Sequence, residues 1–311
     1  MSLPAVTLVI PIFNEAPVLP ELLARLTAVF DGHPAVRWGA LLVDDGSRDG
    51  SAGLIRAHAA RDPRFTLLEF SRNFGFQAAL AAGLAHAAGD AIVTMDADLQ
   101  DPPECIPELV AKWQAGAEVV RAVRRSRAET GARRLGMDVF HNFFSRVSDF
   151  PIEANTGTFG LMSRTAVDAL NTMPERHRFF PGLRSWVGFA TAEIGYDRQE
   201  RAAGQPQQTL RRLVRYAFDG VFSFSYLPLR LLTYAGLLVG AAGFILGLYY
   251  IVKRLVNIET APTGFTTLAA LVLFLGGVQL IGIGVLGEYL ARVYDEVKKR
   301  PLYVIKRGPP G

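Results

Sequence analysis

The chain has 311 residues, which is enough for one large domain or two small ones. Half of its residues are hydrophobic and 20% are charged, a composition that excludes an intrinsically disordered chain. The net charge is only +4, and the single cysteine, Cys105, excludes an intrachain disulfide. The N-terminal residues have no basic stretch before their apolar run, so we expect no signal peptide.

Short apolar runs rich in β-branched residues alternate with stretches of helical periodicity in the first 123 residues. This alternation predicts an α/β fold with an open, mostly parallel sheet, and such sheets bind ligands at the carboxyl ends of their strands. The predicted strands cover residues 5–10, 40–43, 65–70, 91–95 and 118–123, and the predicted helices cover residues 18–30, 51–60, 76–88 and 103–115.

The next part of the chain is less regular. We expect a helix over 131–148, a strand over 156–162 followed by a helix, and an edge strand near 190–196. Residues 176–186 mix basic and aromatic side chains, which fits either an element at a membrane surface or an ordinary helix with a packed aromatic face. Apolar spacing over residues 209–224, with arginines on another face, predicts an amphipathic helix at a membrane surface.

Residues 231–252 and 265–287 form two uncharged runs of about 22 residues, each long enough to cross a bilayer as a helix. Basic residues precede the first run and follow the second, so the positive-inside rule places both ends of the chain in the cytoplasm. We therefore expect a cytoplasmic α/β domain over 1–206, a juxtamembrane amphipathic helix over 207–227, two transmembrane helices within 228–292 and a basic cytoplasmic tail over 293–311.

The segment DADLQDPPE, residues 96–104, lies where a predicted strand ends and a predicted helix begins. Asp96 and Asp98 are two positions apart, so both carboxylates can face one ligand, and these oxygen donors suit Mg²⁺ or Mn²⁺ bound to a diphosphate. We also expect Asp101 to cap the helix that follows. The alternative for this segment is a capped acidic turn that binds no ligand.

Two more polar segments end predicted strands: PIFNE at residues 11–15 and VDDGS at residues 43–47. The second could be an ordinary turn, because Asp, Gly and Ser all favour turns. Since the carboxyl ends of parallel strands meet at one edge of a sheet, we expect all three polar segments to border one crevice.

Together these three segments resemble those of glycosyltransferase family 2, whose nucleotide-sugar-binding domain has the GT-A fold. With SRNFG at residues 71–75 and the paired apolar runs, the chain is similar, more narrowly, to polyprenyl-phosphate glycosyltransferases of the dolichyl-phosphate mannosyltransferase and bactoprenol glucosyltransferase type. The resemblance covers essentially the whole chain and does not identify the sugar.

The resemblance implies roles for individual residues. The catalytic residues would be Asp96, Asp98 and Arg124, and the ligands of Mg²⁺ or Mn²⁺ would be Asp96, Asp98 and Gln100. The nucleotide sugar would be bound by Pro11, Phe13, Glu15, Asp44, Asp45, Asn73, Asp96, Ala97, Asp98, Gln100, Arg124 and Arg134. The lipid phosphate would be held by Arg201, Arg211, Arg212 and Arg215, which could instead reach anionic headgroups.

The chain departs from the family pattern at two positions. Many relatives have a DTGDFRLL-like segment whose second acid is a proposed base, whereas this chain has Thr158 there. Many also have a lysine in an RxxGESK segment, where this chain has Gln207. A phosphate-monoester acceptor is largely dianionic at pH 7, so we expect transfer to need no base.

The resemblance implies an inverting glycosyltransferase in the cell (inner) membrane that moves one sugar from a UDP- or GDP-linked donor to undecaprenyl or dolichyl phosphate, for cell-envelope glycan or glycoconjugate synthesis. Its partners would be the donor, the polyprenyl phosphate, the bilayer and further copies of itself, with no nucleic acid. Two alternatives are a non-catalytic membrane scaffold that binds nucleotide sugars, and a processive polysaccharide synthase.

Overall fold

The structure is a computed structural model that describes residues 3–124, 156–173, 175–176, 178–197, 227–255 and 264–308. The chain divides into two compact units, one formed by Met1–Arg215 with Arg300–Gly311 and the other by Tyr216–Lys299. The first unit contains the sheet and the second contains two long helices, so each is described by itself.

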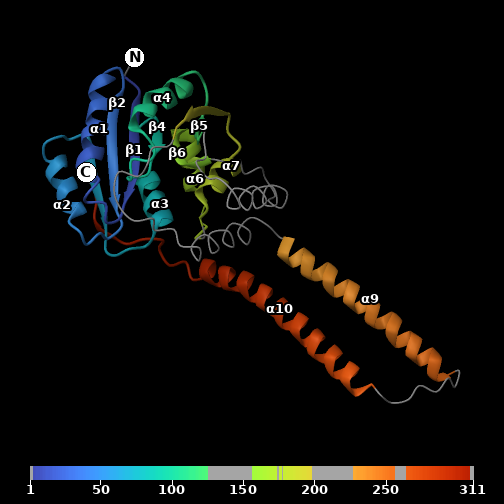
Figure 1. The fold of residues 1–311 in the computed structure, drawn as a ribbon. Coiled ribbons are helices and arrows are strands. Elements are labelled where there is room, and N and C mark those ends of the chain that lie inside the picture. Colours follow the sequence, from blue (N-terminus) through green and yellow to red (C-terminus); the bar gives the residue numbers. More distant parts are fainter. Residues whose placement is uncertain are drawn as a thin grey trace. The chain divides into compact units, whose positions relative to one another are not determined.

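The first unit is built around one eight-stranded sheet (Figure 1). Its order is β7-β5-β6-β4-β1-β2-β3-β8, and strands β4, β1, β2 and β3 run parallel at its centre. Strand β6 is antiparallel to both β4 and β5, and β8 is antiparallel to β3. The strands are β1 (Ala5–Ile12), β2 (Arg37–Asp44), β3 (Phe65–Phe70), β4 (Ala91–Thr94), β5 (Val119–Arg124), β6 (Thr156–Ser163), β7 (Thr191–Tyr196) and β8 (Ile305–Arg307).

Helices cover both faces of this sheet, as its apolar central strands require. Helices α1, α2 and α4 enclose the main core on one face, and α3 and α6 lie together on the other. The helices are α1 (Leu19–Gly32), α2 (Ser51–Ala59), α3 (Phe76–His86), the 3₁₀ helix η1 (Pro103–Cys105), α4 (Ile106–Gln114), α6 (Arg164–Asn171) and α7 (Phe180–Trp186).

The sequence pattern explains how the two layers pack. In α1, Leu19, Leu22 and Leu26 recur at helical spacing, and each is fully buried against the sheet. Helix α3 is instead rich in alanine, which lets it lie close to the opposite face. A Cβ atom on Gly83 would overlap Cγ1 of Val9 and lie 3.3 Å from Cγ2 of Val43, so the close approach requires glycine.

The predicted α/β fold with a mostly parallel sheet is confirmed, and each strand expected in the described region is present. Strand β2 begins at Arg37, earlier than expected, because it pairs with β1 along its full length. Strand β8 was not predicted and lies within the expected basic tail. The helix expected over 131–148 and the amphipathic helix expected over 209–224 fall outside the described residues.

The second unit contains α9 (Leu227–Leu255) and α10 (Phe265–Val297). Helix α10 has a segment, Phe274–Val297, whose length and hydropathy suit a membrane crossing, whereas the described apolar stretch in α9, Leu231–Ile245, is shorter. Among the described residues, one helix therefore meets the criterion, and the predicted pair of spans is not confirmed. The two helices touch where Leu232 lies 3.2 Å from the position of a Cβ on Gly282.

Adding a methyl group at Gly83 should destabilise the fold. We expect Gly83→Ala to lower the free energy of unfolding by about 1–3 kcal/mol, because the new atom overlaps a buried valine in a well-packed layer. Gly53→Ala in α2 is the control, since no atom lies within 4 Å of its added Cβ. Thermal unfolding of the purified protein measures both, and an unchanged midpoint for Gly83→Ala would contradict the packing of α3 described above.

Candidate active site

The carboxyl ends of three neighbouring strands bring the polar segments together. Strand β1 lies between β2 and β4 in the sheet, and all three run parallel. The PIFNE segment covers the end of β1 and the turn after it, the VDDGS segment covers the end of β2 and the turn after it, and the DADLQ segment follows β4. This edge is where an open α/β sheet binds its ligands.

Hydrogen bonds tie the turn after β1 to the turn after β2. The backbone N–H of Asn14 donates to Oγ of Ser47 at 3.0 Å, and the N–H of Arg48 donates to Oδ1 of Asn14 at 2.9 Å. Asn14 has a φ of 56°, a conformation that asparagine tolerates better than most residues. The N–H of Glu15 donates to Oγ of Ser51 at 3.1 Å. Asn14 and the serines therefore shape the turns, a role that the sequence analysis did not assign.

Asp45 fastens the loop of residues 71–75 to the sheet. Its side chain is buried, and its carboxylate accepts hydrogen bonds from the backbone N–H groups of Phe74, at 2.6 Å, and Gly75, at 2.9 Å. Burial raises the pKa of the Asp45 carboxyl, while these two donors act in the opposite direction. The loop includes Asn73, so Asp45 positions a second residue expected at the nucleotide.

Gly46 brings the same loop into backbone contact with the VDDGS turn. Its φ is 72°, and an added Cβ would lie 2.5 Å from the carbonyl carbon of Arg72 and 2.7 Å from the nitrogen of Asn73. Only glycine fits both the conformation and the contact. The neighbouring Asp44 is also buried, and its carboxylate faces the backbone N–H of Ser47 at 3.3 Å.

Three carboxylates lie close together in the turn after β4. Burial, followed by the charges of Asp101 and Asp98, raises the pKa of the Asp96 carboxyl to about 7. The Oγ1 hydroxyl of Thr158 donates to Oδ1 of Asp96 at 3.0 Å and partly offsets that shift. Leu99, at a φ of 58°, reverses the chain so that the N–H of Gln100 reaches Oδ1 of Asp98 at 3.2 Å.

This donor set fits a divalent cation shared with a phosphate ligand. Within the described residues, no group of three or more His, Cys, Asp or Glu side chains is arranged to hold a metal ion alone. Mg²⁺ commonly binds one or two carboxylates and takes its remaining oxygens from water and substrate phosphates. Asp96 and Asp98 could supply those carboxylates, and a bound cation would relieve the mutual repulsion that their burial creates.

Tyr196, at the end of β7, links Asp101 to Arg124. Its hydroxyl donates to Oδ1 of Asp101 and accepts from Nε of Arg124 at 3.2 Å. Its ring is buried and packs edge-on against Phe159 at 5.5 Å. Asp101 is therefore not the predicted helix cap, because η1 is preceded by Pro102 and has no side-chain cap. Tyr196 was not among the predicted site residues, although a strand was predicted at its position.

Two glycines of β6 leave space for neighbouring arginine side chains. An added Cβ on Gly157 would lie 3.1 Å from Nη2 of Arg124, and one on Gly160 would lie 3.1 Å from Nη1 of Arg184. Arg184 is buried and donates from Nη2 to the carbonyl of Gly157 at 3.1 Å. A second buried arginine thus packs against β6, although Arg184 was not among the predicted site residues.

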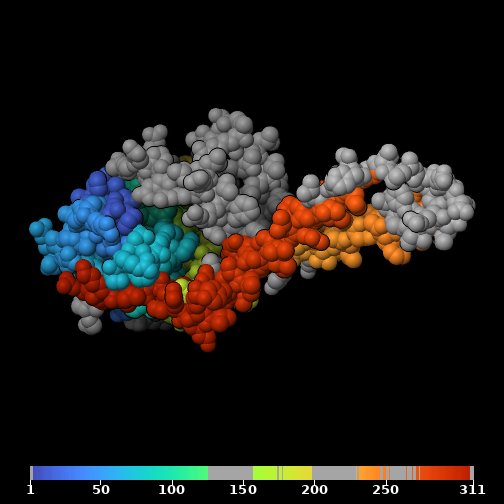
Figure 2. Space-filling model, turned by 90° about the horizontal axis from the view of Figure 1, so that it is seen from below, coloured from blue at the N-terminus to red at the C-terminus, as the bar shows by residue number. Residues whose placement is uncertain are grey.

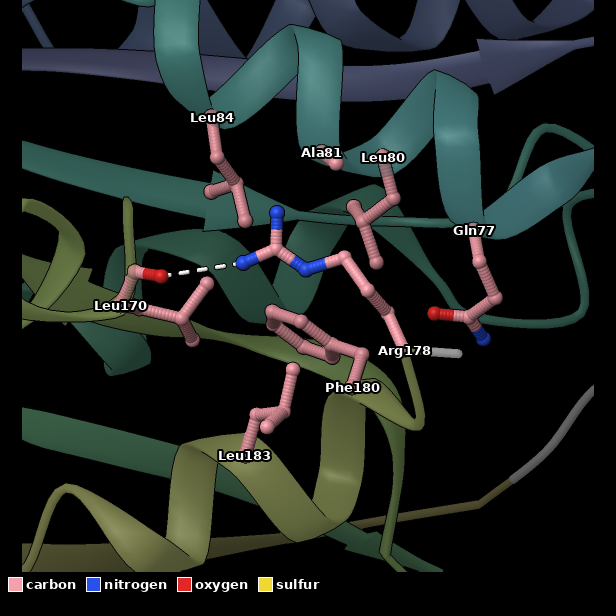
Figure 3. A pocket seen from close by; sticks show the side chains of 8 residues that line it. All are labelled: Gln77, Leu80, Ala81, Leu84, Leu170, Arg178, Phe180 and Leu183. Carbon is pink, nitrogen blue, oxygen red and sulfur yellow. Dashed lines mark hydrogen bonds between the residues drawn. The ribbon is translucent and has the colours of Figure 1, made fainter. Parts of the chain in front are cut away.

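The segment that contains Arg184 packs as part of the fold. Figure 3 shows Arg178 extending between α3 and α7, among Leu80, Phe180 and Leu183, with Nη2 donating to the carbonyl of Leu170 at 3.0 Å. The cavity here has a volume of about 10 Å³, on the order of one water molecule. Of the two interpretations of residues 176–186, these contacts favour an ordinary packed helix.

The remaining predicted site residues are distributed as follows. Pro11 and Ala97 are buried, Phe13, Glu15 and Gln100 are half-buried, and Asn73 is exposed. Outside the described residues lie Arg134, Arg201, Gln207, Arg211, Arg212 and Arg215. The structure thus gathers the predicted residues of the three strand ends and of the 71–75 loop at one edge of the sheet.

A mostly parallel α/β sheet that carries an acidic DxD turn at its strand ends defines the class of GT-A glycosyltransferases. The family model described as Glycosyl transferase family 2 matches residues 7–170, and a second, described as GtrB C-terminal hairpin, matches residues 227–293. The chain belongs to glycosyl transferase family 2, and it is a glycosyltransferase.

Two relatives match the chain over nearly its whole length. The "Prophage bactoprenol glucosyl transferase homolog" of Escherichia coli K12 is 44% identical over 303 residues, which cover 97% of this chain and 98% of that protein. The "SfII prophage-derived bactoprenol glucosyl transferase" of Shigella flexneri is 43% identical over 307 residues, which cover 98% and 99%.

A solved structure shares the fold. Glucosyl-3-phosphoglycerate synthase from Mycobacterium tuberculosis, in complex with Mn²⁺, uridine diphosphate and phosphoglyceric acid, aligns with a TM-score of 0.51 and 18% identity. The alignment covers 71% of this chain and 78% of that one.

Replacing Gly46 should separate the VDDGS turn from the 71–75 loop. We expect Gly46→Ala to destabilise the protein by more than 2 kcal/mol, because it adds a backbone clash to about 1–2 kcal/mol of left-handed strain. Gly50→Ala is a matched control, since Gly50 has a φ of 94° but open space around it. Equal unfolding midpoints for the two variants would contradict the close contact.

Removing the Tyr196 hydroxyl should disturb the acidic turn. We expect Tyr196→Phe to lower the free energy of unfolding by about 1–3 kcal/mol and to slow sugar transfer, because it leaves buried Asp101 without this donor and frees Arg124 from one contact. Tyr234→Phe, on the exposed surface of α9, provides the control. Wild-type rates and stability in Tyr196→Phe would show that the link is dispensable.

Proposed function

We propose that the protein transfers one sugar from a nucleotide sugar to a polyprenyl phosphate, with inversion, at the cytoplasmic face of the cell membrane. The observation that carries the proposal is the acidic turn after β4, which belongs to a chain that also continues into two long apolar helices. Full-length relatives named as bactoprenol glucosyl transferases support the lipid acceptor, and their names make glucose the first sugar to test.

The reaction is a single displacement at the anomeric carbon. An oxygen of the acceptor phosphate forms the new bond to this carbon, and the bond from carbon to the diphosphate oxygen breaks with its electron pair on the departing nucleoside diphosphate. The acceptor phosphate is already largely dianionic at pH 7, so no side chain has to remove a proton. Thr158 in place of an acid is compatible with this chemistry, and its hydroxyl orients Asp96.

The protein contributes position and charge. Pro11, Phe13, Glu15, Asp44, Asp45 and Asn73 would form the nucleoside side of the site, with Ala97 and Gln100 beside them. Asp96 and Asp98, with Gln100, would hold Mg²⁺ or Mn²⁺, which when bound supplies positive charge to the departing diphosphate. Arg124 would contact the diphosphate, supported by its bond to Tyr196, and Arg134 is proposed for the same role.

The same proposal includes an arrangement of the chain in the membrane. Helices α9 and α10 would form a two-helix transmembrane hairpin within residues 228–292, and large apolar side chains such as Leu238 and Ile281 are exposed on them. The 1–206 domain, the 207–227 amphipathic helix and both termini would lie on the cytoplasmic side. Arg201, Arg211, Arg212 and Arg215 are candidates for the lipid phosphate, and a homo-oligomer is proposed.

Removing the Asp98 carboxylate from the acidic turn should nearly abolish sugar transfer. We expect Asp98→Ala to reduce sugar transfer to undecaprenyl phosphate at least a hundred-fold, because the donor diphosphate would lose half of its proposed metal-binding carboxylates. The assay supplies labelled UDP-glucose or GDP-mannose with Mg²⁺ or Mn²⁺ to membranes that contain the full-length protein, and mass spectrometry identifies the lipid product.

Glu104→Gln is the control, because Glu104 belongs to the same segment but is exposed and pairs with Arg25 at 2.7 Å. It should transfer at close to the wild-type rate. Undiminished transfer by Asp98→Ala would overturn the proposed metal site. Donor binding without turnover on any polyprenyl phosphate would instead support the scaffold, and a polymeric product would support the processive synthase.

A further inference from the structure

The C-terminal residues rejoin the sheet beside the loop of residues 71–75. Strand β8 pairs with the end of β3, and Phe70 lies opposite Ile305 in this pairing. The backbone N–H of Ser71 donates to the carbonyl of Val304 at 2.9 Å. Figure 2 shows the red C-terminal residues on the surface of the first unit, beside cyan residues that include α3. Strand β8 thereby covers the edge of β3, where the loop begins.

Three aromatic rings connect this C-terminal segment to the loop. Tyr303 stacks on Phe70 with the ring centres 5.0 Å apart and an interplanar angle of 8°. Phe70 in turn meets Phe74 edge-on, with the centres 5.7 Å apart. The backbone N–H of Phe74 is held by the Asp45 carboxylate. The ring of Tyr303 therefore supports the loop through Phe70 and Phe74, in addition to the hydrogen bonds that hold the loop to Asp45.

A charged contact joins the same two parts of the chain. Glu69 is buried, forms an ion pair with Arg56 and lies 3.9 Å from Nη1 of Arg307. Glu69 is also the partner of Asp44 in the register of β2 and β3. Arg307 thus adds a charged contact between the C-terminal segment and the buried end of β3.

We propose that Tyr303 is a positioning residue for the donor, whose ring holds the 71–75 loop in the conformation that receives the nucleotide. This inference rests on the proposed function for the identity of the donor. Tyr303 follows the two long helices in the sequence, and it would act on the donor site through the loop without itself touching the nucleotide. If the ring acts through the loop, its removal should weaken donor binding and leave the use of the lipid acceptor unchanged.

The test compares variants of the full-length protein in membranes with undecaprenyl phosphate. We expect Tyr303→Ala to raise the KM for the nucleotide sugar about two- to ten-fold, the range expected for loss of one aromatic pair, with the KM for the lipid unchanged. Tyr303→Phe keeps the ring and should restore the wild-type value. Val304→Ala is the matched control, because Val304 contacts Ser71 through its backbone carbonyl.

A second measurement does not depend on transfer. Calorimetric titration of the purified variants with UDP and with GDP, in the presence of Mn²⁺, should show the same two- to ten-fold loss for Tyr303→Ala. If Tyr303→Ala fails to fold, Tyr303→Leu, which keeps apolar volume without the stack, replaces it in both assays.

The outcomes separate the two proposals. Donor KM and nucleotide affinity that stay at wild-type values in Tyr303→Ala would overturn the positioning role, as would equal increases in the donor and lipid KM values. Failure of Tyr303→Phe to restore the donor KM would also overturn it. Absence of transfer by the wild-type protein with every donor would contradict the proposed function, while the calorimetric comparison would still decide the role of Tyr303.

Discussion

The structure concentrates negative charge at one buried edge of a parallel sheet, and much of the local architecture serves to compensate it. Asp44, Asp45, Asp98 and Asp101 are all buried at the ends of β2 and β4. An ionised carboxylate is stable in such a place only if hydrogen-bond donors or cations replace the lost water. Each of the neighbouring loops supplies part of that replacement.

The compensation differs from one carboxylate to the next. Asp45 accepts two backbone N–H groups of the 71–75 loop, and Asp101 accepts the phenol of Tyr196. Asp96 accepts the single hydroxyl of Thr158, and the pKa of its carboxyl stays raised. The ionised form of Asp96 is therefore the least compensated of these carboxylates, and a cation bound beside it would stabilise that form.

Local patterns in the sequence predict most of the sheet but not its C-terminal edge strand, β8. The central strands are recognisable because continuous apolar runs such as Leu41–Val43 alternate with helical periodicity. Strand β8 has only three residues in a basic segment, IKR, and exists because the edge of β3 offers backbone partners. A short strand specified by its partner carries no periodic signal of its own.

The candidate site likewise combines residues that local patterns predict with partners that they do not predict. The acids and glycines of the three strand-end segments could be predicted, because turn chemistry and spacing are local. The partners of those acids could not be predicted, because Tyr196 is 95 positions from Asp101 and Thr158 is 62 positions from Asp96. The predicted cap at Asp101 was wrong for this reason: a distant phenol, rather than the adjacent helix, takes its carboxylate.

The position of β8 in the chain also constrains the order of assembly. Its partner β3 ends at Phe70, whereas β8 begins at Ile305, so both long helices must be synthesised before the two strands can pair. During synthesis the edge of β3 and the Phe70 ring remain uncovered until β8 has left the ribosome and can pair with β3. Completion of the fold in the first unit is therefore a late step that follows synthesis of the second.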